Sequence, residues 1–331
     1  MTTKIVTKEN ISEAAKCLNE GGTVVFPTET VYGLGADAFN SVAVKKIFEA
    51  KGRPGDNPLI VHISDISQIH LLAREIPDNA KLLAQKFWPG PLTMIFKKKD
   101  QVINEVTAGL DTVAVRYPSN QIAHDLIEQS QKVVAAPSAN LSGSPSPTVC
   151  SDVVDDLNGR VDFIIDGTGC EIGLESTVVD VSGNTVTILR PGAITLEMIR
   201  EFIPDAKLDG GLIDNDQVPK CPGLKYTHYS PNADVIVVQG NKDKVREYIL
   251  SHLSSDVGVI TYKGGEYPGA GLVLDAGDNM TSYAHNLFTY LRRFDKNNIK
   301  IVYAEFSVEE GIGVAVRNRL YKACGHKIIE V

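Results

Sequence analysis

The segment KGRPGDNPLIVH, which runs from Lys51 to His62, decides how the rest of the chain is organised. It lies between a predicted helix and an apolar strand, and its prolines exclude helix and force Asn57 into an extended backbone. A stiff loop should therefore hold the Lys51 ammonium, the Arg53 guanidinium and an amide at one edge of a sheet. Such cations commonly bind phosphate oxygens, so the segment is a candidate phosphate site. A solvated basic turn is the alternative.

Hydrophobic periodicity predicts alternating helices and strands on both sides of this loop. In the first part of the chain, helices are predicted at 10–18, 41–50, 78–87, 120–129, 151–157 and 195–202, and strands at 23–26, 59–63, 92–96, 112–117, 133–136, 163–166, 177–181 and 185–189. The segment Gly33 to Ala38 fits a dinucleotide fingerprint, but six residues separate it from the preceding strand, so we reject a dinucleotide site. We expect residues 27–38 to form a loop rich in hydroxyl and carboxyl groups.

Three arginines are predicted to lie at strand ends, each next to a proline or a glycine turn. They are Arg53, Arg116 and Arg190. Repetition of this pattern indicates a site for a polyanion, because guanidinium groups bind phosphates and carboxylates through paired hydrogen bonds. Scattered surface charge is the alternative.

A serine-rich loop, PSANLSGSPSP, follows the buried strand 133–136 directly. Its prolines make it rigid, so its hydroxyls and backbone amides can be preorganised donors for an anion. The same composition also suits an ordinary linker. His62, at the end of its strand, is by itself more typical of a packed residue than of a ligand.

Periodicity is lost from about residue 203 to residue 231, which is long for a loop inside a compact domain. We therefore expect an α/β protein with a first domain at 1–206, built on a twisted mixed sheet, a linker at 207–231, and a smaller domain at 232–331. The alternation of strands and helices in the last part predicts a parallel, Rossmann-like sheet. Aromatic residues between two prolines in the linker favour a lid over the site, since such a segment loses little entropy on ordering. An interdomain spacer with incidental aromatic residues is the alternative.

Composition excludes several classes of protein. The chain of 331 residues has a net charge of −8, which disfavours a stable role in binding nucleic acid. The five cysteines are scattered, which argues against a disulfide framework or a zinc site. No apolar run is long enough for a membrane helix, and the first residues lack a secretion signal, so we expect a cytoplasmic protein.

Eight motifs occur in one order along the chain: PTETVYGLGADA, KGRPGDNPL, WPGPLT, VAVRYP, APSAN, SPSPT, GLESTVVD and LRPG. With these motifs the chain resembles the threonylcarbamoyl-AMP synthase family, in the long form that carries a linker and a second α/β domain. The resemblance implies a nucleotidyltransferase that combines L-threonine, bicarbonate and ATP into threonylcarbamoyl-AMP and releases pyrophosphate. The product would serve the threonylcarbamoyladenosine modification of tRNA.

The resemblance also implies which residues bind each substrate. Threonine would be held by Thr28, His62, Arg116, the backbone of Ala136, and Ser176. ATP would be held by Arg53, Asn57, Thr112, Ser138, Ser146, Arg190 and Tyr229. We add Lys51 for the phosphates and expect it to act with Arg53 in catalysis. Mg²⁺ is expected with the triphosphate, without a dedicated protein cage. The implied partners are the downstream tRNA threonylcarbamoyltransferase proteins, with at most a weak contact to tRNA.

The sequence disfavours two other classes of function. A non-catalytic RNA-binding or ribosome-associated module is disfavoured by the acidic charge and by the lack of interleaved basic and aromatic residues. A carbamoyltransferase related to hydrogenase-maturation proteins is disfavoured because their zinc-finger cysteines and additional domains are missing here.

Overall fold

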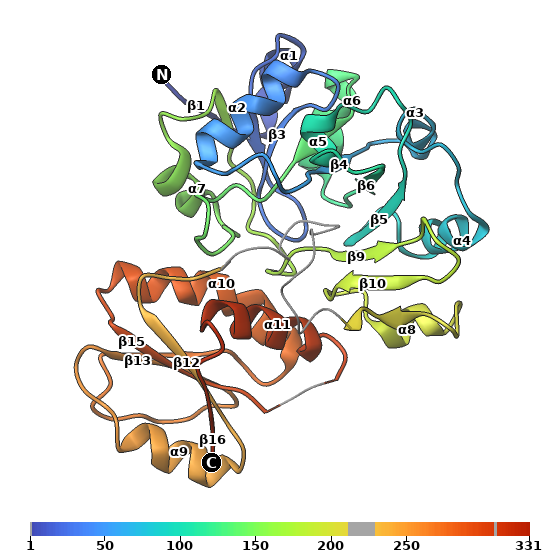
Figure 1. The fold of residues 1–331 in the computed structure, drawn as a ribbon. Helices are drawn as coiled ribbons and strands as arrows, with labels where there is room; N and C mark the ends of the chain where they lie inside the picture. The colour runs from blue at the N-terminus through green and yellow to red at the C-terminus, as the bar shows by residue number, and fades with distance from the viewer. Residues whose placement is uncertain (1, 211–228, 308–309) are drawn as a thin grey trace. The chain divides into compact units, whose positions relative to one another are not determined.

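The computed structural model describes residues 2–210, 229–307 and 310–331, and the chain divides into two compact units (Figure 1). Of the described residues, the first unit comprises 2–142, 147–171 and 175–210, and the second comprises 143–146, 172–174 and the residues from 229 onward. Within the described parts of the chain, no helix is both long enough and apolar enough to cross a membrane.

The first unit is built on an eleven-stranded mixed sheet with the order β1-β8-β2-β3-β7-β4-β6-β5-β9-β10-β11. The strands are β1 Lys4–Val6, β2 Val24–Phe26, β3 Gly33–Asp37, β4 Ile60–His62, β5 Leu92–Lys97, β6 Thr112–Arg116, β7 Val134–Ala136, β8 Phe163–Ile165, β9 Thr177–Asp180, β10 Thr187–Arg190 and β11 Lys207–Leu208. The mixed sheet that the sequence predicts is thus confirmed.

Helices cover both faces of this sheet. They are η1 Lys8–Asn10, α1 Ile11–Asn19, α2 Ser41–Lys51, η2 Ile66–Gln68, α3 Ile69–Leu72, α4 Asp78–Phe87, α5 Asn104–Thr107, α6 Gln121–Ser130, α7 Cys150–Leu157 and α8 Leu196–Arg200. On one face α2, α4 and α7 pack against the largest hydrophobic core. On the other face α1 and α6 lie side by side over β8, β2, β3 and β7 (Figure 1).

The strand register decides which residues share the face that carries α1 and α6. Cross-strand partners lie on the same face, as do residues two apart on one strand. Ile60 pairs with Ala136 and with Ala114, and His62 pairs with Arg116. Arg116 in turn pairs with Thr93. A single face therefore runs from β7 to β5. It carries the polar residues His62, Arg116 and Thr93, with the apolar residues Ile60, Ala114 and Ala136 beside them.

The glycine-rich segment before α2 is a strand, so our prediction of a loop throughout 27–38 was wrong for Gly33–Asp37. All five residues of this strand are buried. A Cβ added to Gly35 would lie 2.5 Å from Val134 Cγ1 and 2.8 Å from Phe26 Cε1. Glycine is needed here for close approach, and its low strand propensity concealed β3 from the sequence analysis.

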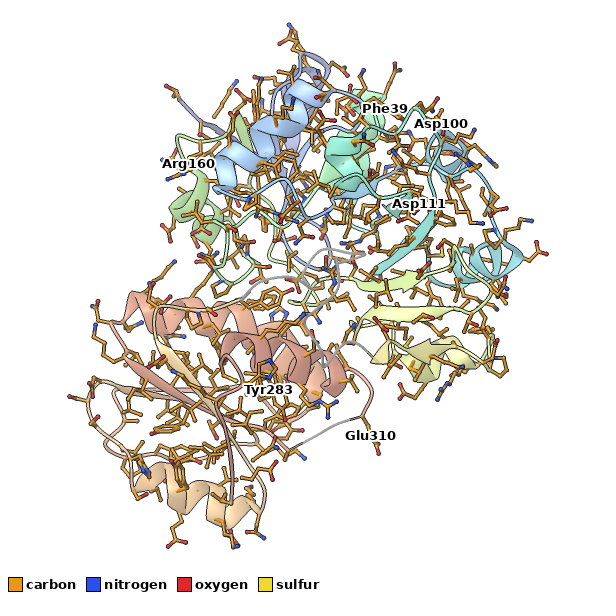
Figure 2. The ribbon with its side chains drawn as sticks, in the orientation of Figure 1. Phe39, Asp100, Asp111, Arg160, Tyr283 and Glu310 are labelled. Carbon is orange, nitrogen blue, oxygen red and sulfur yellow. The ribbon has the colours of Figure 1, made fainter. Side chains whose placement is uncertain are left out.

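The second unit has a five-stranded parallel sheet, which confirms the prediction for this region. Its elements are β12 Asp234–Gln239, α9 Lys242–Leu250, β13 Val257–Thr261, β14 Leu272–Asp275, α10 Met280–Lys296, β15 Ile301–Glu305, α11 Gly313–Ala323 and β16 Ile328–Glu330. Tyr283 of α10 is fully buried and donates a hydrogen bond of 3.0 Å to the carbonyl of Glu305 (Figure 2).

The boundary between the domains is only partly described. Lys207–Leu208, which we assigned to the linker, pairs with β10 and so extends the first sheet by one strand. Residues 211–228 of the predicted linker lie outside the described residues. The division into domains at 206 and 231 stays a prediction.

Candidate functional site

The five residues predicted for threonine all belong to the first unit. The strand register places four of them on one face of its sheet, and Thr28 lies beside Arg116. His62 and Arg116 are direct partners at the ends of β4 and β6. Ala136 is two residues from Val134, the partner of His62. Ser176 immediately precedes β9, two residues before Val178, the partner of Thr93. Thr28 follows β2, and its Oγ1 lies 3.5 Å from Arg116 Nη2. The tertiary structure thus brings Thr28, His62 and Arg116 together and places Ala136 and Ser176 further along the same face.

Arg116 is a buried cation, and its nearest opposite charge is Glu29. Its Nη2 lies 2.8 Å from Glu29 Oε1, with both side chains about 5 % exposed or less. Arg116 Nε and both Glu29 oxygens have no aligned hydrogen-bond partner among the described residues. Buried polar atoms are almost always hydrogen-bonded, so these unsatisfied atoms mark a place for a polar ligand.

His62 is neutral in this environment. Burial, and then the positive charge of Arg116, lower the pKa of its imidazole from about 6.5 to about 3. Its Nδ1 lies 3.2 Å from the carbonyl of Ile60, and its ring meets Phe26 edge-on at 5.9 Å. A neutral imidazole can exchange hydrogen bonds with a ligand but adds no charge beside Arg116.

A second polar cluster surrounds Ser176. Its Oγ lies 2.8 Å from Thr93 Oγ1 and accepts a hydrogen bond of 3.1 Å from Arg190 Nη2. Arg190 Nε also donates to the Ser176 carbonyl at 3.1 Å, and all three residues are buried. The cluster joins a residue predicted for threonine to one predicted for ATP. Thr93 escaped the sequence analysis, although a buried hydroxyl in the apolar strand LTMIF was an available signal.

Lys51 is buried and holds the serine-rich loop in place. Its Nζ donates to the carbonyls of Ser138 and Asn140, each at 2.5 Å. Ser138 Oγ in turn donates to Asn140 Oδ1 at 2.6 Å. The ammonium therefore fixes the position of Ser138, which is predicted to bind ATP. A direct contact between Lys51 and phosphate stays a prediction.

Arg53, Asn57 and Thr112 lie toward the beginning of β4 and β6, opposite the end that carries His62 and Arg116. Thr112 is four residues before Arg116 on the same face, about 13 Å away along the strand. Arg53 Nη2 donates to the Asn57 carbonyl at 3.0 Å. The Asn57 side-chain amide is buried, and neither of its polar atoms has a hydrogen-bond partner among the described residues. This end of the face therefore offers further polar groups to a ligand.

Ser146 and Tyr229 belong to the second unit, and both are buried there. The Tyr229 ring stacks on Phe288 of α10, with centroids 5.1 Å apart. The guanidinium carbon of Arg319 lies 5.8 Å from the Tyr229 ring. The end of the predicted linker is thus anchored on α10 and α11.

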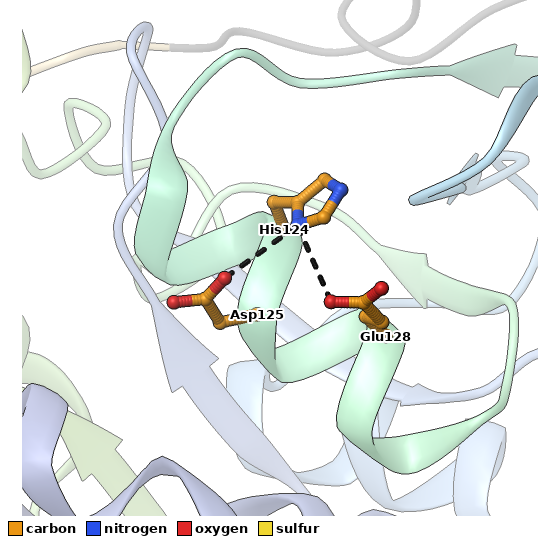
Figure 3. A group of neighbouring side chains, drawn as sticks. All are labelled: His124, Asp125 and Glu128. Carbon is orange, nitrogen blue, oxygen red and sulfur yellow. Dashed lines mark ion pairs between the residues drawn. The ribbon is translucent and has the colours of Figure 1, made fainter.

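Three side chains of α6 form a group with the geometry of a candidate metal site. His124, Asp125 and Glu128 on α6 point ligand atoms toward one another, with His124 Nδ1 3.5 Å from Asp125 and 3.9 Å from Glu128 (Figure 3). All three are partly or fully exposed and belong to one helix, an arrangement common without any metal. We assign no metal to it.

Nothing in the described site suggests a covalent nucleophile. Burial raises the pKa of the Cys170 thiol to about 12, so it is protonated at neutral pH. Instead the site offers buried guanidinium groups and hydroxyls from several strand ends. Such a face suits an enzyme that binds anionic substrates and catalyses group transfer by positioning and charge neutralisation.

Comparison with known proteins narrows this class to one family. Residues 16–192 match the Sua5/YciO/YrdC model, described as telomere recombination, and residues 194–325 match the model for the threonylcarbamoyl-AMP synthase C-terminal domain. The chain therefore belongs to the threonylcarbamoyl-AMP synthase family.

Individual relatives agree along the whole chain. It is 47 % identical to the threonylcarbamoyl-AMP synthase of Pyrococcus abyssi over all of both chains. It is 46 % identical to that of Bacillus subtilis, over 96 % of this chain and 94 % of the relative. The crystal structure of P. abyssi Sua5 complexed with L-threonine superposes with a TM-score of 0.95 at 46 % identity, covering both chains fully.

Proposed function

We propose that this protein makes threonylcarbamoyl-AMP from L-threonine, bicarbonate and ATP, with release of pyrophosphate. The threonine amine first forms a carbamate with bicarbonate, and a carbamate oxygen then attacks the α-phosphorus of ATP. The product is supplied to tRNA threonylcarbamoyltransferase proteins, and the reaction takes place in the cytoplasm. Membership of the family supports this assignment.

The observation that carries the proposal is the hydrogen bond between Arg190 and Ser176. Ser176 is assigned to threonine and Arg190 to ATP, and the reaction requires the two substrates to meet. The remaining threonine residues lie on the same sheet face, near Arg116. Arg53, Asn57 and Thr112 lie toward its other end, where they would hold the more distant parts of ATP. Charge neutralisation by the arginines would supply most of the catalysis.

The expected requirement for Mg²⁺ is consistent with a reaction that uses ATP. Mg²⁺ binds few protein carboxylates when triphosphate oxygens and water complete its octahedral shell. Glu29 lies beside the Arg116 guanidinium, and the carboxylates of Asp125 and Glu128 on α6 are partly or fully exposed. We therefore propose that Mg²⁺ is held by ATP itself and neutralises its phosphates.

The linker that ends at Tyr229 would close over this site. An adjacent His–Tyr pair was replaced by alanine in a P. abyssi Sua5 variant whose structure superposes with a TM-score of 0.94, at 45 % identity over 100 % of this chain and 98 % of that one. This chain has a His–Tyr pair at His228 and Tyr229. The packing of Tyr229 on Phe288, within the second unit, would give the linker a fixed end.

The test is an assay of pyrophosphate release with purified full-length protein. Release should require ATP, L-threonine and bicarbonate together, and mass spectrometry should detect threonylcarbamoyl-AMP. Reactions that lack one substrate at a time are the controls. Release of pyrophosphate at an equal rate without threonine would contradict the proposal.

We also predict the order of amino acid substrates. L-Serine, which lacks the methyl group, should be poorer than L-threonine by roughly 10- to 200-fold in kcat/KM. L-Valine should be poorer still, because buried groups that bind the threonine hydroxyl would be left unpaired. Competition assays with the three amino acids measure this order. Comparable rates with valine and threonine would show that the hydroxyl is not recognised.

A further inference from the structure

Glu29 is a buried carboxylate for which the site described above gives no role. It lies in the turn between β2 and β3, and its side chain is 5 % exposed. Its Oε1 approaches Arg116 at 2.8 Å, yet neither of its oxygens accepts an aligned hydrogen bond from the described residues. Burial of a carboxylate is costly unless donors satisfy it. The position therefore favours a ligand that brings its own donors.

The neighbouring hydroxyls do not take the place of such a ligand. Thr28 Oγ1 donates to the carbonyl of Val31 at 2.6 Å and lies 2.8 Å from Thr30 Oγ1. It also lies 3.2 Å from the backbone nitrogen of Thr30, which donates to it. These groups satisfy one another inside the turn, and the carboxylate of Glu29 remains as the acceptor beside Arg116.

An α-amino acid is a zwitterion, and it fits a buried pair of opposite charges. Its carboxylate needs a cation, which Arg116 supplies on the assignment above. Its ammonium has three donors and no acceptor, and it needs an anion close to that cation. Glu29 and Arg116 lie side by side with the required charges. When threonine enters, each charge of the pair gains a partner, and the site stays neutral as a whole.

We propose that Glu29 binds the ammonium group of threonine and accepts its proton, an inference that rests on the proposed function. The ammonium transfers one proton to the Glu29 carboxylate, which leaves a neutral amine and a carboxylic acid. The nitrogen lone pair then attacks the carbon of bicarbonate. The new N–C bond forms, the amine loses a second proton, and the bicarbonate hydroxyl leaves with it as water. The product is the threonine carbamate, in which the carbamate group keeps the single negative charge of bicarbonate and the α-carboxylate is unchanged.

The other ionisable groups beside this pair do not compete for the proton. His62 stays neutral, since burial and the charge of Arg116 lower its pKa to about 3. The Cys170 thiol is influenced by both Arg116 and Glu29, and burial raises its pKa to about 12. Between pH 7 and pH 9 neither group changes its charge. Glu29 is thus the base that faces Arg116 from the turn.

A binding experiment separates this role from a purely structural ion pair. Calorimetry with the full chain, without ATP or bicarbonate, compares L-threonine with 2,3-dihydroxybutanoate, in which a hydroxyl replaces the ammonium. In Glu29→Gln, threonine should bind about tenfold or more weakly, because a charged acceptor is lost. Dihydroxybutanoate should bind within about twofold of the wild-type affinity. Equal weakening of both ligands, or no weakening of either, would overturn the proposal.

A rate experiment tests the proton transfer. At saturating substrates, pyrophosphate release by Glu29→Gln should fall by about 100-fold or more, and should recover partly between pH 7 and pH 9 as free amine accumulates. Glu29→Asp keeps the charge and should retain more activity than Glu29→Gln at every pH. A Glu29→Gln rate equal to wild type would refute the base. Thermal melts establish that each variant is folded. If Glu29→Gln does not fold, Glu29→Asp tests the position of the carboxylate: it should weaken the binding of threonine more than that of dihydroxybutanoate, and equal effects on both ligands would overturn the proposal.

The calorimetry experiment tests the ammonium site independently of the proposed reaction. If wild type binds threonine through Glu29 but releases no pyrophosphate, the reaction assignment fails and the ammonium site remains. If pyrophosphate release is normal in Glu29→Gln, the site fails and the reaction remains.

Discussion

Arg116→Lys should lower kcat/KM for threonine by about 100- to 1,000-fold, the effect of about 2.7–4 kcal/mol of lost transition-state binding. Lysine keeps a positive charge beside Glu29 but lacks the planar fork that holds a carboxylate through two hydrogen bonds. Arg116→Ala would not isolate the effect on threonine binding. It would leave Glu29 buried without its opposite charge and destabilise the fold by about 3–5 kcal/mol. Steady-state pyrophosphate release at varied threonine concentration measures the effect.

Arg53→Lys is the matched variant for the other substrate. Arg53 is assigned to ATP and lies before β4, whereas Arg116 lies at the end of β6. The Arg53 variant should therefore change kcat/KM for ATP and leave threonine affinity, measured by calorimetry without ATP, within about twofold. If both variants impaired both substrates equally, the assignment of separate anions would be wrong.

Tyr229→Ala should reduce threonylcarbamoyl-AMP synthesis by about tenfold or more while the protein remains folded. The Tyr229 ring stacks on Phe288 and lies near the Arg319 guanidinium, so its loss should release the end of the linker. An open linker would admit water to the carbamate and adenylate, which are lost on exposure. The measurement is product formation by mass spectrometry beside a thermal melt.

Tyr229→Phe is the control for this variant, because it keeps the ring and removes only the hydroxyl. It should retain most of the activity if ring packing anchors the lid. Loss of activity to the same extent in both variants would indicate instead that the hydroxyl acts on ATP. Full activity of Tyr229→Ala would rule out the lid.

Local patterns along the chain determined much of the fold and part of the site. Proline chemistry placed an irregular loop between α2 and β4, and alternation of strands and helices predicted the parallel sheet of the second unit. Arg116 and Arg190 lie at the ends of β6 and β10, as the sequence predicted, but Arg53 lies in the loop between α2 and β4 and not at a strand end. The polyanion site itself stays a prediction. The glycine strand β3 escaped, since its residues are selected for close packing and not for strand propensity.

Tertiary structure decided how distant residues combine. Arg116 forms an ion pair with Glu29, and Ser176 forms a hydrogen bond with Thr93. The Lys51 ammonium donates hydrogen bonds to carbonyls of the serine-rich loop. No local pattern specifies these pairs, because each joins segments that become neighbours only through the strand order and register of the sheet. The sequence predicted phosphate binding for Lys51 from its charge. Burial adds a stronger requirement, because an ammonium removed from water must have its hydrogen bonds satisfied by the nearest acceptors, which here are backbone carbonyls.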